Sequence, residues 1–517
     1  MDFKKALLTL GLATVMLTAA CGNEQAEPVE LAAFNEAETN SSKVVEMIDA
    51  ITAVDFTTEA AIDDAFLAYC SLTDSNKEKV TNYEKLEEYR AQLAKLYNTE
   101  DKQGERMDRT KINIGTYCVY APCYTDEGIK AIADCGIDFL TNPGYNDGLF
   151  DLLEKYNLGA FVSGVVPGWY TGGDVGGTTN AGTMSSSNPL TAYDNGIESF
   201  VDRDCIWGID VGDEPWTVDL PHFGDVIDHL IEGFPGKAIY LNLLPGFANG
   251  AEATDKYLET YVENVNTDYI CYDHYVYAYL RRTHEENFDF FLGDLQHAQK
   301  ICNENDRDFW IVLQANSNFD RPLTEDEIRI QASLALTYGV RTISWACWQA
   351  GWFNYNIADS NGNPTEVYDY VKAVNEEIHI ISPVISRYDS VVSGFIGKDP
   401  KVLSSNVNTD APTPVAEFKA SEIENCSISE IKTDENSMIF AGYFEKNEGE
   451  GSAVMFTNTS DYYCAENPVS IVYFTVKDAE AKVMAYYNGE AFEPENLENG
   501  QYKISIRNSD NILVTIG

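Results

Sequence analysis

Two adjacent carboxylates, Asp213 and Glu214, are the residues of this chain best suited to chemistry. They end an apolar stretch, CIWGIDVGD, that begins at Cys205 and is typical of a buried strand, and Pro215 stops that strand. Strand alternation places Glu214 on a face of small and acidic residues, which needs a polar space to point into. In a (β/α)8 barrel this space is the active site. The structural alternative is that Asp213 caps the next helix and Glu214 is a solvated acid in its first turn.

The elements around this pair indicate which fold positions it. From residue 111 onward, short apolar strands alternate with helical patterns, which favours a parallel sheet. Eight strands are expected, the count of one (β/α)8 (TIM) barrel of the α/β class. We assign residues 106–386 to this barrel, with strands over 112–119, 137–141, 160–166, 206–212, 238–244, 269–276, 309–314 and 342–348.

Polar and aromatic side chains gather where these strands end. Asp273 is the third carboxylate expected at this rim, after Asp213 and Glu214. Trp169 stands in a long connection rich in Gly, Ser and Thr, and loops of that length usually have a function or are mobile. Carboxylates, amides and aromatic faces together are what a sugar-cleaving site needs. The candidates for binding a sugar are Tyr117, Asn142, Trp169, Trp216, Asn242, Tyr272, His274, Tyr275, Gln314, Trp345, Trp348 and Trp352.

Metal and nucleotide chemistry have little support. His274 could be a metal ligand or a base, but a hydrogen bond to a neighbour or a sugar hydroxyl is the simpler interpretation, because no paired histidine spacing accompanies it. Ten cysteines follow Cys21 with no C-x-x-C pair or zinc spacing, so we expect mostly free thiols and no metal. No glycine-rich phosphate-binding motif follows a strand, so we expect no nucleotide and no other cofactor.

The net charge narrows the classes of partner. Lys and Arg number 35 against 83 Asp and Glu, which gives a net charge of −48. Nucleic acids need a basic surface, so we exclude them as partners. An acidic surface suits a soluble extracellular protein and a neutral or cationic ligand, and it does not bear on the fold. An oligosaccharide or polysaccharide is the partner that fits the expected rim.

Two modules are expected on either side of the barrel. Residues 43–103 show helical periodicity, and residues 387–517 show short alternating strands separated by turns, which predicts a β-sandwich. The sandwich could bind carbohydrate or support the barrel, and we favour support because no cluster of exposed aromatics is evident. The helical stretch resembles a module of surface proteins from Gram-positive gut bacteria, in the wording VVEMIDAI and AIDDAFLAYCSLTDSNKEKVTNYEKLEEYRAQL. That resemblance implies surface display or a spacer role.

The first residues are a targeting segment. Residues 1–20 have a basic start and an apolar run, and the run LTAA leads into Cys21. This resembles a bacterial lipoprotein signal, which implies lipidation of Cys21 and a protein anchored on the extracellular face of the cell membrane. Residues 21–42 are polar and acidic, as expected of a tether. A plain secretory signal is the alternative.

The barrel resembles the (β/α)8 glycoside hydrolases over roughly residues 111–385. Glu214 takes the place of the general acid/base of the large clan of retaining β-glycosidases, and Trp345 or Trp348 resembles the Trp beneath their sugar. The segment TEDEIRIQASLALTYGVRTISWACW resembles the helix and strand that close barrels of β-galactosidase-like hydrolases. The chain departs from the clan at Asp213, where the clan has Asn, and at Gln314, where the clan has its nucleophilic Glu.

Three mechanisms remain open. Some families that cleave N-acetylhexosaminides have an adjacent Asp-Glu pair, and the resemblance implies that Asp213 assists the substrate's own acetamido group while Glu214 is the acid/base. Tyr272-Asp273 resembles a Tyr-Asp of chitinase-type enzymes, although the chitinase D-x-D-x-E pattern is broken here. An inverting pair of Glu214 and Asp273 would need carboxyls about 6.5–9.5 Å apart. A standard mechanism with two glutamates is disfavoured by Gln314.

The sequence therefore predicts a glycosidase that cleaves O-glycosidic bonds of an extracellular glycan. Its catalytic residues would be Glu214, Asp213 and Asp273. The alternative is a barrel that has lost its nucleophile and captures glycans at the cell surface. Gln314 motivates that alternative, and an intact acid at Glu214 counts against it.

Overall fold

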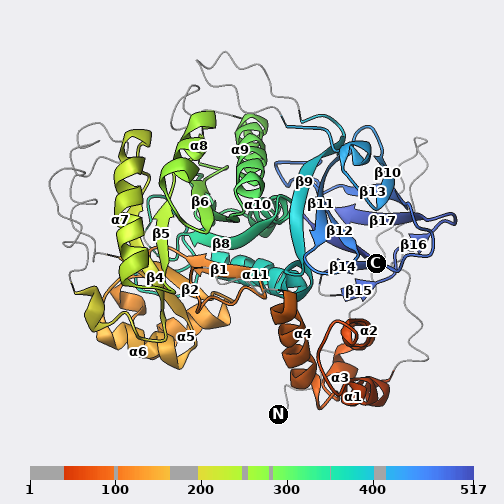
Figure 1. Ribbon diagram of the computed structural model, residues 1–517, viewed down its shortest axis with the longest axis horizontal. Helices are drawn as coiled ribbons and strands as arrows, with labels where there is room; N and C mark the ends of the chain where they lie inside the picture. The colour runs from red at the N-terminus through yellow and green to blue at the C-terminus, as the bar shows by residue number, and fades with distance from the viewer. Residues whose placement is uncertain are drawn as a thin grey trace, which may run out of the picture.

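The computed structural model describes residues 40–97, 103–163, 196–246, 254–278, 283–349, 351–400, 415–488 and 490–517. Helices come first along the chain, then a barrel, then two antiparallel sheets (Figure 1). Within these ranges, none of the helices has the length and hydropathy that crossing a bilayer requires. The predicted signal segment with Cys21, and Trp169 in the long connection, lie outside the described residues.

Eight parallel strands form the barrel, which confirms the predicted fold class. The sheet runs in the order β5-β4-β3-β2-β1-β8-β7-β6, and a bridge between Leu243 and Tyr272 joins its two edges. Its strands are β1 (Asn113–Thr116), β2 (Phe139–Gly144), β3 (Gly159–Ser163), β4 (Ile206–Asp213), β5 (Ala238–Asn242), β6 (Tyr269–His274), β7 (Asp308–Gln314) and β8 (Val340–Ala346).

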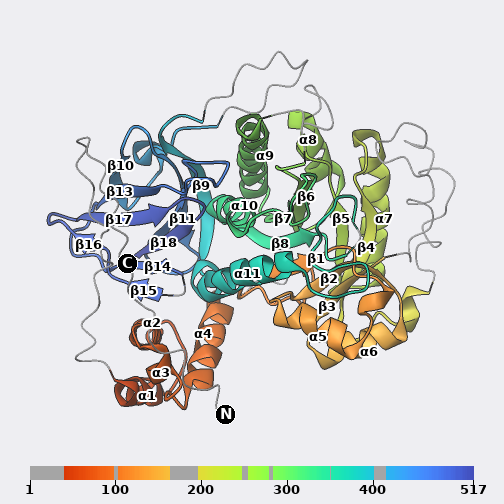
Figure 2. The same cartoon turned by 180° about the vertical axis from the view of Figure 1, so that it is seen from behind.

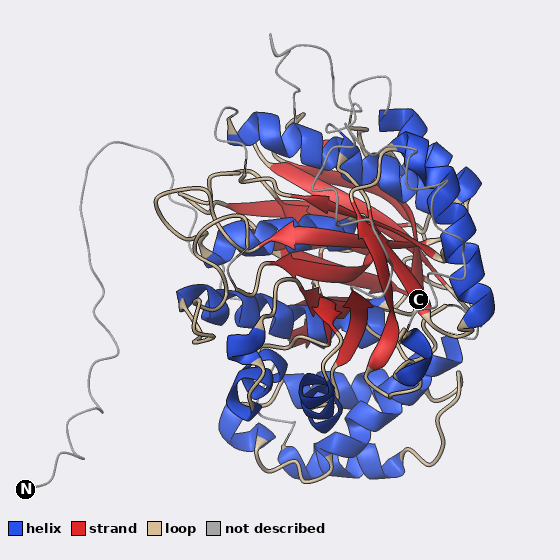
Figure 3. Cartoon of the chain, turned by 90° about the vertical axis from the view of Figure 1, so that its left-hand side faces the viewer, coloured by secondary structure: helices blue, strands red, loops and turns tan. Residues whose placement is uncertain are grey.

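Helices surround these strands (Figure 3). Several begin where the sequence supplies a cap: Thr283 and Glu286 form a capping box at the start of one helix, and Thr324 and Glu327 do so at the next. The helices of the barrel are α5 (Asp126–Asp134), α6 (Asp147–Lys155), α7 (Leu220–Gly233), α8 (Thr254–Asn264), α9 (His284–Glu304), α10 (Glu325–Thr337) and α11 (Glu366–Ile385). Short 3-10 turns span Ala121–Cys123, Ile197–Ser199 and Thr217–Asp219.

The barrel has two apolar cores, one on each face of its strands. The inner core fills the lumen with aromatic rings, and Tyr269 and Trp310 stack there with centroids 3.8 Å apart. The outer core lies between the strands and the helices. Because successive side chains of a strand point to opposite faces, neighbours in the sequence belong to different cores. This alternation decides which predicted residues can reach a site in the barrel mouth.

Two antiparallel sheets follow the barrel, in agreement with the predicted β-sandwich. One sheet runs β10-β13-β17-β16 and the other β15-β14-β18-β12-β11-β9. The larger sheet packs on α9 and α10, and Gly442 allows the close approach because a Cβ there would lie 1.9 Å from the Thr337 carbonyl oxygen. The strands are β9 (Tyr388–Gly397), β10 (Ile428–Thr433), β11 (Met438–Lys446), β12 (Ser452–Asn458), β13 (Val469–Val476), β14 (Val483–Tyr487), β15 (Glu490–Phe492), β16 (Glu495–Asn496), β17 (Gln501–Arg507) and β18 (Asn511–Ile516), with a 3-10 turn at Ala420–Glu422.

The N-terminal helices are docked on the rest of the molecule. They are α1 (Ser41–Ala50), α2 (Glu59–Cys70), α3 (Asp74–Lys77) and α4 (Tyr83–Tyr97), and Figure 2 shows α11 between α4 and the barrel strands. Arg387, which follows α11, pairs with Glu59 at 2.7 Å and Asp63 at 3.3 Å, and Lys446 of β11 pairs with Glu59 at 2.9 Å. We call these four residues the junction network, because they join helical module, barrel and sandwich.

Candidate active site

Two aspartates converge on one amide at the carboxyl ends of neighbouring strands. Asp213 ends β4, Asn242 ends β5 and Asp273 lies near the end of β6. Asn242 Nδ2 donates to Asp213 Oδ1 at 2.9 Å and to Asp273 Oδ1 at 3.3 Å. Both oxygens are bound to one nitrogen, so they lie within about 6 Å of each other. We call Asp213, Glu214 and Asp273 the carboxyl cluster.

The end of β4 turns Glu214 into the same space. The pairing of β4 with β5 shifts register between Asp210 and Gly212, and the Glu214 N–H donates to the Asn242 carbonyl at 2.9 Å. Glu214 itself has a φ of 48°, in the left-handed region that non-glycine residues rarely adopt. This local irregularity brings both members of the Asp213-Glu214 pair to the mouth, which regular alternation would not do.

Burial and mutual repulsion favour the protonated forms in this cluster. Burial raises the pKa of Glu214 to about 9, and the charges of Asp273 and Asp213 add to the shift. Burial also raises the pKa of Asp273 to about 7 with help from Asp213, while hydrogen bonds from Tyr275 and Asn242 oppose it. Burial raises the pKa of Asp213, and the hydrogen bond from Asn242 opposes this rise. Glu214 therefore holds a proton at neutral pH, as a general acid must.

Aromatic side chains form one wall beside the cluster. The Tyr275 hydroxyl bonds to Asp273, and its ring lies 5.6 Å from that of Trp352 and 5.9 Å from that of Phe353. Trp352 is 51% exposed, so its ring face is open to a ligand. In the lumen, the hydroxyl of Tyr117 meets that of Tyr240 at 2.6 Å. The structure thus brings Tyr275 and Trp352 to the rim, and it places Tyr117 in the packed barrel interior.

The structure corrects four predicted sugar contacts, because their side chains face the surrounding helices. Tyr272 belongs to the outer core with Phe309, and His274 Nδ1 lies 2.9 Å from Asp294 of α9. The other two contact α11. Trp345 Nε1 donates to Asn375 Oδ1 at 2.8 Å, and the ring of Trp348 packs against that of Tyr368. A position at a strand end does not by itself decide which face the side chain takes.

Gln314 is bound by the protein itself. Its Oε1 accepts the Tyr277 N–H at 2.9 Å and its Nε2 donates to the Asn316 carbonyl at 3.0 Å, with no exposed surface. The amide thereby ties the loop after β6 to the loop after β7. This corrects the prediction that Gln314 contacts sugar, and it gives the side chain a structural role that an ionised carboxylate could not fill, since a carboxylate cannot donate.

Three further predicted residues have other surroundings. Asn242 is predicted to bind sugar, but its amide is already shared between Asp213 and Asp273. Asn142 is half-buried at β2 with a φ of 57°, and its carbonyl accepts the Ser163 hydroxyl at 2.8 Å. Trp216 precedes the 3-10 turn at Thr217–Asp219, and its buried indole N–H has no hydrogen-bond partner among the described residues. A ligand contact for Asn142 and Trp216 stays a prediction.

No sequence pattern singles out Cys118 and Cys347, which lie near this mouth. Cys118 follows β1 and Cys347 follows β8, and both side chains belong to the inner core. As single residues in apolar strands they resemble ordinary core cysteines. Among the described residues, no group of three or more His, Cys, Asp or Glu could hold a metal ion.

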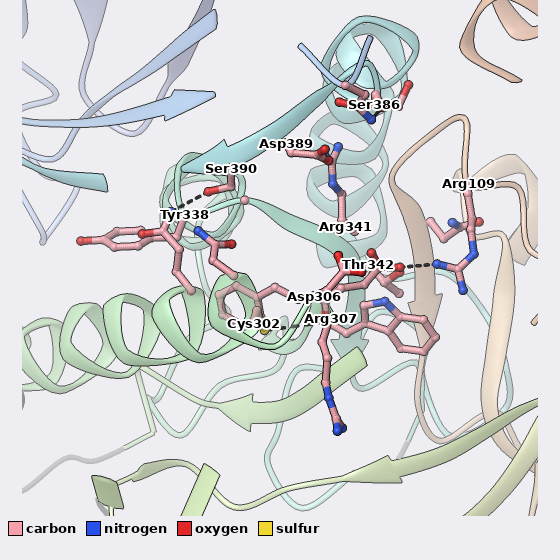
Figure 4. Close-up of a pocket in the computed structure, with 18 of the residues that line it drawn as sticks. Arg109, Cys302, Asp306, Arg307, Tyr338, Arg341, Thr342, Ser386, Asp389 and Ser390 are labelled. Atoms are coloured by element: carbon pink, nitrogen blue, oxygen red, sulfur yellow. Dashed lines mark hydrogen bonds and ion pairs between the residues drawn. The ribbon is translucent and has the colours of Figure 1, made fainter. Parts of the chain in front are cut away.

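A cavity of about 360 Å³ lies at the opposite end of the barrel (Figure 4). Its lining includes Lys111, Asp308 and Thr342, which stand where β1, β7 and β8 begin. Charged groups here are matched to one another: Arg109 pairs with Asp308, and Arg341 bonds to the Ile385 carbonyl and to Asp389. Conserved chemistry in (β/α)8 barrels belongs to the carboxyl ends of the strands, so we place the candidate site at the carboxyl cluster.

Comparisons with known proteins add fold neighbours. No family model matches the chain, and no curated protein matches it. Solved structures with a similar fold include the β-galactosidase of the psychrophilic Marinomonas ef1, at 11% identity and a TM-score of 0.39, over 52% of this chain and 60% of that one. The polyextremophilic β-galactosidase of Halorubrum lacusprofundi is similar at 9% identity and a TM-score of 0.42, over 78% of this chain and 99% of that one. Another is the endo-β-1,4-mannanase of Thermotoga petrophila, at 10% identity and a TM-score of 0.38, over 80% of this chain and 98% of that one. Likeness at this level says nothing about the reaction.

Proposed function

We propose that this protein is a glycosidase that hydrolyses O-glycosidic bonds of an extracellular glycan, with Glu214 as general acid/base. The observation that carries the proposal is the carboxyl cluster: Asp213 and Asp273 both accept from the Asn242 amide, and the Glu214 backbone bonds to the Asn242 carbonyl, beside the aromatic wall of Tyr275 and Trp352. A glycosidase needs a protonated carboxyl for the leaving oxygen, a second carboxylate and a surface for the sugar ring. The raised pKa of Glu214 supports its role as the acid.

Substrate assistance is the mechanism we favour. Glu214 donates its proton to the leaving glycosidic oxygen while the acetamido oxygen of the substrate attacks the anomeric carbon, so that the old C–O bond breaks as the new one forms. Asp213, fixed by Asn242, stabilises the positive charge that develops on the acetamido N–H. Water then attacks the anomeric carbon, Glu214 takes its proton, and the acetamido group is released. Asp273 and Tyr275 orient the sugar in this scheme.

Paired aryl glycosides test this mechanism. Glucoside and galactoside would be compared with their N-acetylamino counterparts, using wild type, Asp213→Asn and Glu214→Gln. We expect turnover of the N-acetyl substrates only, and its loss in both variants. Turnover of the plain glycosides would contradict substrate assistance and favour an inverting pair, with Asp273 as base. The variant Asp204→Asn is the control, because that side chain is 94% exposed.

A surface glycan-binding protein without turnover is the second candidate. Gln314 favours it, since its amide fills the position of the expected nucleophile and is held by Tyr277 and Asn316. Binding of glycans without release of reducing ends, over a broad panel, would establish this candidate. Loss of turnover with retained binding in Glu214→Gln would establish the enzyme.

Anchoring at the cell surface is part of the proposal. It rests on the basic and apolar segment before Cys21. Expression of the full chain in a bacterium fed a labelled fatty acid should label the wild-type protein and leave Cys21→Ala unlabelled. Labelling of both proteins, or of neither, would contradict lipidation at Cys21.

A further inference from the structure

A chain of hydrogen bonds runs through the lumen of the barrel and ends at the carboxyl cluster. The hydroxyl of Tyr117, just after β1, meets that of Tyr240 on β5 at 2.6 Å. The Tyr240 hydroxyl lies 3.3 Å from the Cys271 sulfur on β6, and that sulfur lies 3.7 Å from Asn242 Oδ1. The nitrogen of the same amide then donates to both aspartates of the cluster. We call Tyr117, Tyr240 and Cys271 the lumen chain.

The direction of every bond in this chain follows from what each group can donate. The amide nitrogen of Asn242 faces two carboxyls, which accept, so the amide oxygen faces Cys271. An amide oxygen only accepts, so the one proton of the Cys271 thiol points to Asn242, and the sulfur accepts from Tyr240. The Tyr240 hydroxyl in turn accepts from that of Tyr117. The four groups are thereby aligned head to tail, with the amide N–H groups directed at the cluster.

All three members of the lumen chain are buried, at most 6% exposed, and burial raises the pKa of each, so each keeps its proton. Titratable neighbours of the chain and of the two aspartates include Asp210, Glu214, Tyr257, Tyr269, Tyr275 and Cys118. The lumen of a (β/α)8 barrel is usually filled by branched apolar side chains, which need no hydrogen-bond partners. Polar groups that are aligned here and end at the cluster therefore indicate a role in the cluster.

We infer that the residues of the lumen chain are positioning residues of the candidate active site, which fix the Asn242 amide with its nitrogen toward both aspartates. Their role in catalysis rests on the proposed function, whereas the fixed amide does not. Hydrogen bonds donated to a carboxylate favour its ionised form. Two ionised aspartates raise the pKa of Glu214 through their charge, in addition to its burial. The lumen chain thus helps to keep the proton on the general acid.

Cys271→Ala is the main test, because it removes the thiol that meets the amide oxygen. The buried oxygen then has no donor, so the amide loses its fixed orientation and its hydrogen bonds to the aspartates weaken. On a cleaved aryl glycoside, the alkaline limb of the kcat/KM profile reports the protonated acid of the free enzyme, and it should move down by about one pH unit. Cys271→Ser keeps a donor and an acceptor at this position and should recover most of that shift.

A measurement without substrate separates the lumen chain from the proposed reaction. Without the amide N–H groups, the aspartates bind protons more tightly in the folded protein, and stability is then lost over a wider range as the pH rises. Between pH 5 and pH 8.5 the unfolding equilibrium constant of Cys271→Ala should rise about ten-fold more than that of wild type. This result without turnover of any substrate would support the fixed amide and reject the glycosidase. Parallel curves would overturn the inference, even in an active enzyme.

The other members of the chain should have effects that decrease with distance from the amide. Tyr240→Phe and then Tyr117→Phe should move both pH profiles in the same direction by less, because each hydroxyl acts only by polarising the next bond. If Cys271→Ala does not fold, Tyr240→Phe decides the test. Tyr261→Phe is the matched control, since this buried hydroxyl bonds to Thr267 at 2.7 Å in the outer core. A shift in Tyr261→Phe as large as that in Cys271→Ala would indicate a general loss of packing and contradict the inference.

Discussion

The carboxyl cluster and the junction network both bury acidic groups, but only one of them supplies cations. At the junction, burial acts to raise the pKa of Glu59, and hydrogen bonds from Tyr97 and Lys446 with the charge of Arg387 leave it lowered. At the mouth, the groups around Glu214 are carboxyls and its pKa is raised. The cations of the junction network stabilise the ionised form of Glu59 in the folded protein, whereas the neighbouring carboxyls at the mouth destabilise the ionised form of Glu214. Acidic groups that a fold buries without a compensating cation are candidates for a functional site.

The largest effect is expected from Glu214→Gln. The amide keeps the shape of the side chain and removes the transferable proton, so turnover of a cleaved aryl glycoside should fall by about 10³-fold, within the range of general acid catalysis. Steady-state kinetics measure this, and glycan binding should remain. Asp204→Asn, with its exposed carboxyl, should keep wild-type turnover. Turnover within a few-fold of wild type in Glu214→Gln would remove this residue from the mechanism.

The junction network should respond in stability instead. Arg387→Met leaves Asp63 without its cation. Because the arginine side chain is only 3% exposed, water cannot replace it easily, and the free energy of unfolding should fall by about 3 kcal/mol. Urea unfolding measures the change, and turnover at low denaturant should stay at the wild-type value. Arg106→Met is the matched control, because its partner Asp204 is exposed and such pairs contribute under about 1 kcal/mol. Equal losses in the two variants would contradict the comparison.

Gln314→Glu tests whether the missing nucleophile can simply be restored. We expect no gain in turnover and a loss of about 2 kcal/mol in the free energy of unfolding, because an ionised carboxylate cannot donate to the Asn316 carbonyl. Gln314→Met is the companion variant, since it removes both hydrogen bonds and adds no charge. A rise in turnover for Gln314→Glu would show that the site accepts a nucleophile there and would contradict the structural role of the amide.

The sequence predicted the architecture because periodicity reports it directly. Eight apolar strands separated by helical patterns specify a closed parallel barrel, and Asp213 and Asp273 lie at the carboxyl ends of β4 and β6. The orientation of single side chains was harder. Asp273 faces the lumen while its neighbours Tyr272 and His274 face the helices. Successive side chains of a strand point to opposite faces, so an error of one residue in the register assigns a side chain to the wrong face.

Two further features depend on contacts between distant segments. The register shift in β4 and the left-handed backbone of Glu214 turn the acidic pair inward, and no propensity specifies such an irregularity. Sequence periodicity describes each element by itself, so it does not specify the register between the ends of neighbouring strands.

The pH dependence of stability sharpens the comparison. The folded pKa of Glu214 is raised to about 9, whereas an unfolded glutamate titrates near about 4.3, so the folded state holds the extra proton between these values. Stability from this group is therefore present below about pH 4.3 and is lost as the pH rises toward 9, by at most about 1.4 kcal/mol per pH unit. Denaturant midpoints at pH 5, 7 and 8.5 should show a flatter profile for Glu214→Gln. Parallel profiles would contradict the shift.

The smallest effect is expected from the aromatic wall. Trp352 is 51% exposed and contacts Tyr275 at 5.6 Å, so Trp352→Ala should remove a stacking face and leave the fold intact. We expect a rise in KM of roughly 2- to 10-fold, the equivalent of an aromatic contact, with kcat and the unfolding midpoint near wild type. Phe56→Ala is the matched control, because Phe56 is 49% exposed on the helical module and packs on Tyr97. An unchanged KM for Trp352→Ala would confine sugar binding to the carboxyl cluster and the deeper rings.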